Sequence, residues 1–437
     1  MRRRSAVRRR ETYRDSLLVG SRRVVGYSGG GLAKKTSRWR RRGLYMLGGI
    51  AVAVPALWIG IHEVPWLGPA LADGVRAVLG PKPIAWAEDV TYGIQDRFDR
   101  WRYKDAAPKT FWDVPSGTPT APPPATPVAS APTPVALASG APVAAPAPAA
   151  PAAEGAFPPP TFSPPYEGVA SPGDGTWIAM KEPGLAKAVV HPDPKRSFAA
   201  VAVVAMDLRR TSLHLVAGTS EPQGNVPQER RPGIVPKDAA GDLVAAFNGG
   251  FKAMHGHYGM MLEGDTFVAP RDIACTVGLY RDGAIKIGTW SALKTTEAQM
   301  LGYRQTPPCL VENEKTNSAL DLEYSKNWGA TVSGETVIRR SAIGIDKSGT
   351  TLFYGFGEAV TAQALARAMQ AIGATDAAQL DVNYSYPRFL LYEPGFPGQS
   401  PHVESALIPG IKYTRGEYVT DSAPRDFFYV TRKRPPS

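Results

Sequence analysis

The residues best placed for chemistry follow a short apolar run at 243–247, which predicts a buried strand. The run stops at Asn248, Gly249 and Gly250. Two glycines permit backbone conformations in which main-chain N–H groups turn toward a ligand. A polar loop at the end of a buried strand is a common place for binding and catalysis. An ordinary hairpin turn is the alternative interpretation of Asn-Gly-Gly.

The same loop carries Lys252, His255 and His257. An imidazole titrates near neutral pH and can act as a general acid for a leaving oxygen, so both histidines are candidate catalytic residues. Two alternatives remain, a metal site and histidines that merely bond to backbone carbonyls. No third ligand of suitable spacing follows, so neither a metal nor any other cofactor is expected, and the sequence does not support a divalent ion.

A second polar group follows a predicted strand at 378–382, which delivers the carboxylate of Asp381 at its end. Asn383, Ser385 and Tyr386 come next and are candidate substrate-binding residues. Earlier in the chain, Arg340 precedes an apolar strand. An arginine there is usually a solvated edge residue, but one that points inward can bind a phosphate through its forked guanidinium.

The charge of the chain is concentrated at its start. Residues 1–42 hold 15 Lys or Arg and two acids, a net of +13, whereas the whole protein is +11, so the rest sums to −2. A basic surplus is therefore missing beyond residue 42, and we expect no nucleic-acid partner.

Residues 43–61 carry no charge over 19 positions, which is enough to cross about 28 Å of hydrocarbon as a helix. Arginines precede this segment and tryptophans lie near its far end, which predicts a transmembrane helix with a cytoplasmic basic tail at 1–42. The main domain would then be extracytoplasmic, periplasmic or at the cell surface. A cleaved signal peptide is the alternative, but its basic and apolar parts are usually shorter and end at a small-residue cleavage site.

Two connecting segments follow. Residues 62–114 include apolar side chains at helical spacing, which predict an amphipathic helix that lies on the membrane surface or packs on the main domain, with its aromatic stripe as core: Trp86, Val90, Ile94, Phe98 and Trp101. Residues 115–165 are rich in Pro, Ala, Thr and Ser and predict a disordered spacer.

Residues 166–437 are long enough for one domain with a large core, and their pattern predicts an α+β fold with mixed sheets rich in strands. Residues 197–208 and 213–217 predict paired strands, and hairpins are expected at 276–290 and 337–356. A helix should begin at Thr361 and end at Gly373.

The chain has two cysteines, Cys275 and Cys309. An even pair outside the cytoplasm favours a disulfide, and buried thiols are the alternative.

Four segments taken together resemble the phosphodiester glycosidase family: LVAAFNGGF, PCLVENEK, RRSAIGID and TAQALARAMQAIGATDAAQLD. The resemblance spans about 197–392. It implies hydrolysis of a bond between a sugar and a phosphate, with Asn248, Gly249 and Gly250 lining the pocket, Arg340 facing the phosphate and Asp381 at the reaction centre. The chain departs from the family where relatives read Leu-Asp-Gly-Gly-Gly-Ser, because residues 380–385 are Leu-Asp-Val-Asn-Tyr-Ser.

Two functions are therefore expected as alternatives. The first is a membrane-anchored hydrolase of glycosyl phosphodiesters or related cell-envelope polysaccharide, whose partners are the glycan or glycosyl-phosphate substrate and the bilayer around residues 43–61. The second is an envelope glycan-binding or assembly protein without catalysis on the same fold. Ordinary glycosidases use two placed acids. The sequence offers Asp381 and, for the other acid, only Glu263, Asp265 or Asp272.

Overall fold

The computed structural model describes residues 80–113 except 109, and residues 157–433 except 322–326, 330–335, 383 and 396–398. Between 45 and 79 it describes isolated positions only. In this described part, no helix has both the length and the apolar character to cross a bilayer. Most of the expected span at 43–61, and most of the expected spacer at 115–165, lie outside the described residues.

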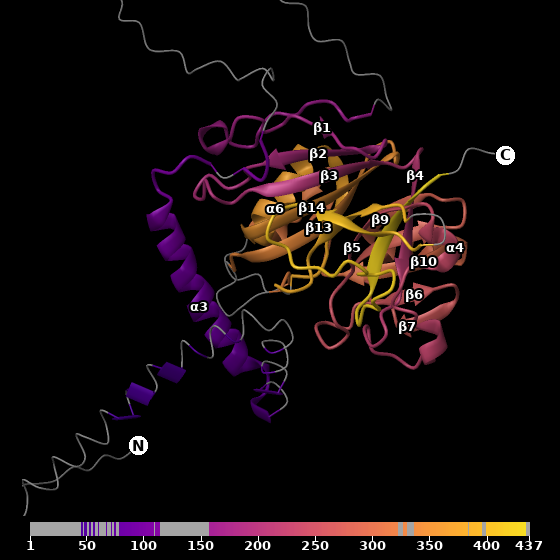
Figure 1. Cartoon of the computed structure of the whole chain (residues 1–437), viewed down its shortest axis with the longest axis horizontal. Coiled ribbons are helices and arrows are strands. Elements are labelled where there is room, and N and C mark those ends of the chain that lie inside the picture. Colours follow the sequence, from indigo (N-terminus) through magenta and orange to yellow (C-terminus); the bar gives the residue numbers. More distant parts are fainter. Residues whose placement is uncertain are drawn as a thin grey trace, which may run out of the picture. The chain divides into compact units, whose positions relative to one another are not determined.

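Three antiparallel sheets build the domain (Figure 1). The largest has eight strands, ordered β1-β2-β3-β14-β13-β15-β11-β12. Its long central hairpin turns near Lys347-Ser348-Gly349, as predicted. The strands are β1 (Ile178–Ala179), β2 (Leu185–Val190), β3 (Val201–Asp207), β11 (Val311–Glu312), β12 (Lys315–Thr316), β13 (Ile338–Asp346), β14 (Thr351–Val360) and β15 (Ala374–Gln379).

The other two sheets have five strands each, ordered β7-β6-β10-β8-β9 and β17-β16-β5-β18-β4. The predicted hairpin at Asp282-Gly283 is the turn between β8 and β9. The first sheet contains β6 (Met260–Leu262), β7 (Asp265–Val268), β8 (Cys275–Tyr280), β9 (Ile285–Thr289) and β10 (Met300–Thr306); the second contains β4 (Thr211–Val216), β5 (Leu243–Asn248), β16 (Phe389–Glu393), β17 (His402–Ala406) and β18 (Phe427–Arg432).

Helix α6 (Ala362–Ala371) packs on the eight-stranded sheet through Leu365 and Met369. Thr361 caps it by accepting a hydrogen bond from the Ala364 N–H at 3.0 Å, as its sequence predicts. Gly373 follows with φ 92°, a left-handed conformation that glycine adopts without strain. The remaining described helices are α3 (Pro81–Arg102), α4 (Lys237–Ala240), α5 (Trp290–Leu293) and the 3₁₀ turns η1 (Glu167–Val169), η2 (Gln228–Arg230), η3 (Lys294–Gln299) and η4 (Ser318–Asp321).

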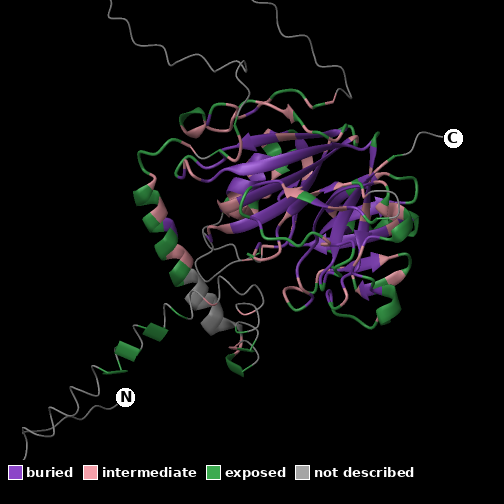
Figure 2. Cartoon of the chain, viewed as in Figure 1, coloured by how far each residue is buried: buried purple, intermediate pink, exposed green. Residues whose placement is uncertain are grey.

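The main core lies where the three sheets meet, and most residues of its strands are buried (Figure 2). Phe247 of β5 stacks on Phe389 and Phe428 of its neighbouring strands, with ring centroids 5.6 and 5.4 Å apart. Cys275 of β8 forms a disulfide with Cys309, which precedes β11, and the Cα atoms lie 4.7 Å apart. The pairing expected from the sequence therefore links two of the sheets.

One expected strand pairing is wrong. β3 and β4 both form, but β3 pairs with β2 and β14, whereas β4 pairs with β18 in another sheet. Asp207 ends β3, and its carbonyl accepts a bond from the Thr211 hydroxyl at 2.8 Å. The two strands are close in sequence and apolar, but they face each other across the core instead of sharing hydrogen bonds.

The amphipathic helix at α3 is confirmed, but its orientation differs from the expectation. Val90, Ile94, Phe98 and Trp101 are exposed, at 41, 57, 51 and 73%. The face that packs on the domain carries Asp96, which is buried there, and Arg196 binds its two oxygens at 2.6 and 2.8 Å. A buried carboxylate needs a charged partner, and Arg196 provides it.

The domain also extends further toward the N-terminus than expected. Phe157 and Phe162, which fall in the predicted spacer, pack beside the core under α6. The Phe162 N–H donates to the Gly175 carbonyl at 3.0 Å. Bulky aromatic side chains supply apolar surface that burial stabilises, so this part of the predicted spacer packs on the core.

Candidate active site

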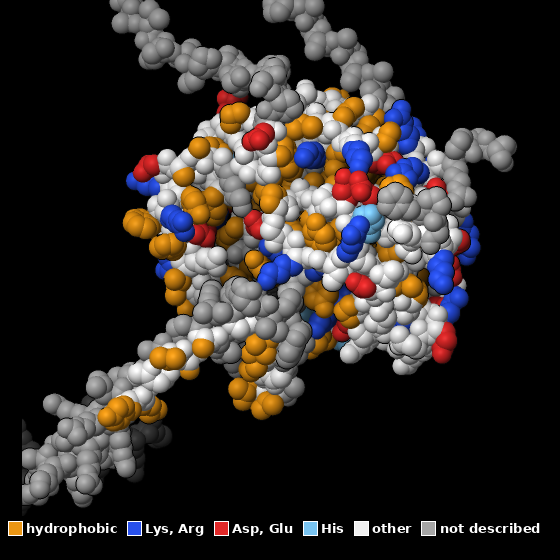
Figure 3. Space-filling view, in the orientation of Figure 1, with side chains coloured by type: hydrophobic (Ala, Val, Ile, Leu, Met, Phe, Trp, Pro, Cys, Tyr) orange, Lys and Arg blue, Asp and Glu red, His pale blue; other side chains and the backbone are white. Residues whose placement is uncertain are grey.

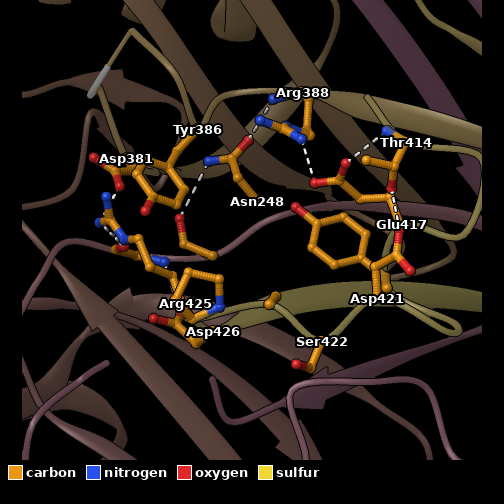
Figure 4. A pocket seen from close by; sticks show the side chains of 15 residues that line it. Asn248, Asp381, Tyr386, Arg388, Thr414, Glu417, Asp421, Ser422, Arg425 and Asp426 are labelled. Atoms are coloured by element: carbon orange, nitrogen blue, oxygen red, sulfur yellow. Dashed lines mark hydrogen bonds and ion pairs between the residues drawn. The ribbon is translucent and has the colours of Figure 1, made fainter. Parts of the chain in front are cut away.

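Polar side chains from three separate stretches of the chain line one pocket of about 220 Å³ (Figure 4). The first stretch is the end of β5 at Asn248. The second is the loop that leaves β15 and contains Asp381, Tyr386 and Arg388. The third is the segment 414–426, which runs into β18. Asn248 and Asp381, which the sequence placed in one site, thus share one pocket.

Asn248 joins the elements around this pocket. Its side-chain oxygen accepts bonds from the Tyr354 hydroxyl at 2.9 Å and the Arg388 N–H at 3.2 Å. Its amide nitrogen donates to the Ser341 hydroxyl at 2.9 Å, and Ser341 in turn donates to the Asp381 carbonyl at 3.1 Å. The Asn248 side chain therefore fixes the loop after β15 at two points, Asp381 and Arg388.

Gly249 and Gly250 line the pocket, as the resemblance implied, but their N–H groups are bonded within the protein. The Gly249 N–H donates to the Asp426 carbonyl at 3.0 Å, and the Gly250 N–H donates to Asp426 Oδ2 at 2.9 Å. The expectation that these N–H groups face a ligand is thus wrong, because Asp426 occupies both. A Cβ on Gly249 would lie 2.0 Å from Asp426 Oδ2, so only glycine fits.

Asp426 is itself held by a buried arginine from another sheet. Arg304 of β10 donates through Nε and Nη2 to the two carboxylate oxygens, at 2.8 and 3.2 Å. Both side chains are about 99% buried or more. A buried pair of this kind is stable only when both partners are present. The Arg304–Asp426 pair packs directly against Gly250.

Asp381 lies beside a second arginine. Arg425 makes an ion pair with its carboxylate and donates to the Gly250 carbonyl at 3.1 Å. The guanidinium also lies over the Tyr386 ring, 4.1 Å from the centroid. The Val382 N–H donates to Asp381 Oδ1 at 2.7 Å. These contacts orient the carboxylate and place an aromatic ring beside it, an arrangement that suits a sugar ring.

A third carboxylate faces the pocket from the segment before β18. Glu417 makes an ion pair with Arg388 and accepts a bond from the Thr414 N–H at 3.0 Å. Tyr418 follows it, and burial raises the pKa of its hydroxyl well above the ordinary value. The phenol therefore stays protonated at neutral pH and acts only as a neutral hydrogen-bonding group.

The lining is rich in paired charges and slightly acidic. It includes four carboxylates and two arginines: Asp381, Glu417, Asp421, Asp426, Arg388 and Arg425. Arg304, which is buried outside the pocket lining, neutralises the carboxylate of Asp426. An anion that enters must compete with carboxylates for Arg388 and Arg425 instead of meeting unpaired cations.

Arg340 does not line this pocket. Its guanidinium is about 98% buried on the other side of β13, where it donates to the carbonyls of Val360, Trp328 and Thr336 at 2.6–3.0 Å and to Gln379 at 2.9 Å. Side chains alternate along a strand, so Ser341, one residue on, faces the pocket side and Arg340 cannot. The predicted contact of Arg340 with a phosphate in this pocket is therefore wrong.

The two histidines also lie away from this pocket's lining. His255 is half-buried and His257 is exposed, with φ 50°, in the loop after Phe251. Ser385 uses its carbonyl to accept a bond from Arg388 and does not line the pocket, whereas Tyr386 does. Asn383 lies outside the described residues. No group of three or more metal-binding side chains is found in the part of the chain that the structure describes.

Sequence reasoning missed the residues of segment 414–426, namely Glu417, Arg425 and Asp426. The proposed second acids, Glu263, Asp265 and Asp272, lie elsewhere, and the first two bind Arg230. Segment 414–426 has no apolar periodicity or glycine pattern to mark it. The one available signal is the Pro424-Arg425-Asp426 cluster directly before the apolar strand β18.

Residues 241–381 match the phosphodiester glycosidase family. This segment of the chain is similar to phosphodiester glycosidases. The match begins just before β5 and ends at Asp381, so it includes the Asn248 loop but not Arg388 or segment 414–426. The phosphodiester glycosidase match covers 141 of 437 residues. The resemblance stated from the sequence is confirmed.

The likeness of this chain to solved structures is distant. The catalytic domain of zebrafish N-acetylglucosamine-1-phosphodiester alpha-N-acetylglucosaminidase, auto-inhibited by its pro-peptide, is 14% identical with a TM-score of 0.38; the likeness covers 58% of this chain and 86% of that one. A hypothetical protein from Synechocystis is 11% identical with a TM-score of 0.36, covering 57% and 62%. A protein from Burkholderia pseudomallei is 11% identical with a TM-score of 0.27, covering 53% and 74%. No curated protein matches the sequence significantly.

Proposed function

We propose that this phosphodiester glycosidase domain hydrolyses glycosyl phosphodiesters or a related cell-envelope polysaccharide. The observation that carries the proposal is the ion pair of Asp381 with Arg425, whose guanidinium lies over the Tyr386 ring; all three residues line one pocket. A glycosidase needs a carboxylate near the anomeric carbon, where positive charge develops in the transition state. A phosphodiester also needs a cation near its leaving oxygens.

The paired charges suggest how substrate binding prepares the site. A phosphate that takes hydrogen bonds from Arg425 removes the partner of Asp381 and leaves that carboxylate to the sugar. The ring of Tyr386 would stack on the sugar face. Water then supplies the oxygen that bonds to the anomeric carbon, and the bond between this carbon and the phosphate oxygen breaks, with its electrons leaving on the phosphate.

Glu417 is the second carboxylate in this scheme. It lines the same pocket as Asp381 and is oriented by Arg388 and by the Thr414 N–H. A phosphate leaving group needs little protonation, so a base that activates water is the more useful role for Glu417. The scheme uses neither histidine.

We further propose that the enzyme is anchored in a membrane by residues 43–61, with the basic tail inside and the domain outside the cytoplasm. The support for this location is the uncharged run of 19 residues and the step in charge at Arg42 and Gly43.

The test is hydrolysis of a panel of sugar-1-phosphodiesters by the full chain. Asp381→Asn keeps the shape and removes the charge, so turnover should fall at least about a hundredfold with substrate binding little changed. Glu417→Gln should also reduce kcat, by about 10²- to 10⁴-fold if it is the general base. The exposed Asp105→Asn is the control and should retain parental turnover.

A non-catalytic glycan-binding role is the second candidate. It is favoured by the loss of the glycines after Asp381 and by the prior pairing of both pocket arginines. The parent chain and Asp381→Asn would then bind glycan with equal affinity, and neither would cleave any phosphodiester offered. That result would replace the proposed hydrolase with a glycan-binding protein.

A further inference from the structure

Helix α3 presents an apolar stripe that no described part of the domain covers. Val90, Ile94, Phe98 and Trp101 are 41–73% exposed. Phe98 and Trp101 lie against each other, with centroids 5.8 Å apart. Hydrophobic side chains are visible at the surface along this helix (Figure 3). A stripe of four large apolar side chains on one helix face marks an interaction surface when it stays exposed.

The stripe cannot turn inward, because the opposite face of α3 is fastened to the domain. Asp96 is on that face and is bound by Arg196, which also donates to Asp193 at 2.8 Å. At the end of the helix, Tyr103 packs on Phe198 with centroids 5.5 Å apart. At about 100° per residue, Asp96 lies nearly opposite the centre of the stripe.

Basic side chains border the stripe on both edges. On the helical wheel Arg97 lies about 20° outside Val90, and Arg102 lies about 40° outside Phe98. Both are exposed. The acid Asp96 is buried in its ion pair, and Asp99 is half-buried toward the docked face. Among the side chains of α3 that the structure describes, the exposed charge beside the stripe is therefore positive. An apolar face that contains Trp and Phe and has flanking arginines is typical of helices that lie in the interface of an anionic bilayer.

The position of α3 in the chain also favours a lipid bilayer as the partner of the stripe. The uncharged segment ends at residue 61 and α3 begins at Pro81, so 19 residues separate them. Such a length reaches at most about 65 Å when fully extended. If 43–61 is the membrane anchor proposed above, α3 is tethered close to the bilayer surface.

We propose that the exposed stripe of α3 docks onto the headgroup region of an anionic lipid bilayer and thereby holds the domain at the membrane. The Asp96–Arg196 contact then acts as the joint between the docked helix and the phosphodiester glycosidase domain. Membrane docking goes beyond the proposed catalysis and does not depend on it.

The experiment uses the full chain reconstituted into phosphatidylcholine vesicles with and without phosphatidylglycerol. Ile94→Cys receives a fluorescent label, and Lys347→Cys, in the exposed β13–β14 turn, is the matched control. The native cysteines are joined to each other, so each chain carries one label. We expect lipid-borne quencher to reduce emission at position 94 and aqueous iodide to have little effect there, with the reverse at 347.

Two variants test the cause of docking. Phe98→Ser with Trp101→Ser should restore iodide quenching at 94, and these exposed positions leave folding intact. Arg97→Gln with Arg102→Gln should lower the ratio of docked to free helix in anionic vesicles roughly thirtyfold and change it little in neutral ones.

Each other outcome overturns docking. Iodide quenching at 94 in a chain that floats with vesicles refutes docking and keeps the anchor. A chain that does not float refutes both. Protection of position 94 from both quenchers that grows with the protein-to-lipid ratio would mean that the stripe pairs with a second copy. Hydrolysis is measured separately, so its failure is distinguishable.

Discussion

Asn248 uses its side chain to hold neighbouring residues of the pocket in place. All of its polar atoms are used, by Tyr354, Ser341 and the Arg388 N–H. The residues that face the pocket as charges, Asp381 and Glu417, are instead oriented by arginines. Asn248 is therefore a positioning residue, and the chemistry belongs to the carboxylates.

A single histidine should control part of the dependence of stability on pH. His214 of β4 stacks on Tyr429 at 4.6 Å and lies 2.9 Å from the Thr431 hydroxyl, and burial lowers its pKa below 6.5. At pH values between the lowered pKa and 6.5, the unfolded chain binds more protons at this histidine than the folded chain does. The contribution of His214 to the free energy of unfolding is therefore present at higher pH and is lost as the pH falls through this window.

The variant His214→Gln lacks that titration. Urea unfolding of both proteins between about pH 7.5 and about pH 5 should show that the parent loses more stability than the variant. An equal loss in both proteins would mean that His214 charges in the folded state as easily as in the unfolded chain.

At the scale of elements, the end of β5 is fixed by its contact with the start of β18. Asn248 and Phe427 are directly paired in register, so Asp426 must pack against Gly249. Gly249→Ala would place a Cβ 2.0 Å from the Asp426 carboxylate, and overpacking of this kind should cost about 1–3 kcal/mol.

Gly241→Ala is the matched control, because nothing lies within 4 Å of its Cβ position and its φ is −65°. It should leave stability unchanged or raise it by about 0.4–1 kcal/mol. Thermal unfolding of the two variants measures the difference. Equal stability of both would show that β18 can move away from β5 without cost.

At the scale of the molecule, the Cys275–Cys309 bond ties β8 to the segment that leads into β11, and so joins two sheets. It closes a loop with a sequence separation of 34. Cys275→Ala with Cys309→Ala should lower the free energy of unfolding by about 2–4 kcal/mol.

Urea unfolding of the parent under non-reducing conditions provides the comparison. The parent treated with a thiol reductant should move toward the double variant, while the double variant should not respond. Insensitivity of the parent to reductant, together with two thiols that alkylate freely, would contradict the bond.

The sequence by itself determined the local structure of this protein. Hydrophobic periodicity, turn residues and caps act between near neighbours, which is why β5, the hairpins at Asp282-Gly283 and Lys347-Ser348-Gly349, and the helix capped by Thr361 were predicted correctly. The family resemblance then brought Asn248 and Asp381 into one site.

Only the tertiary structure decided which charges meet. Asp381 is 44 residues from Arg425, and Arg304 is 122 residues from Asp426, so no sequence spacing predicts either pair. Spacing also does not predict the partners of Arg340, whose guanidinium donates to backbone carbonyls because it lies on the side of β13 away from the pocket. Nor does it predict that α3 packs on the domain through the ion pair of Asp96 with the buried Arg196. Ion pairs across sheets depend on the packing of strands far apart in the chain, and that packing is set by the whole core.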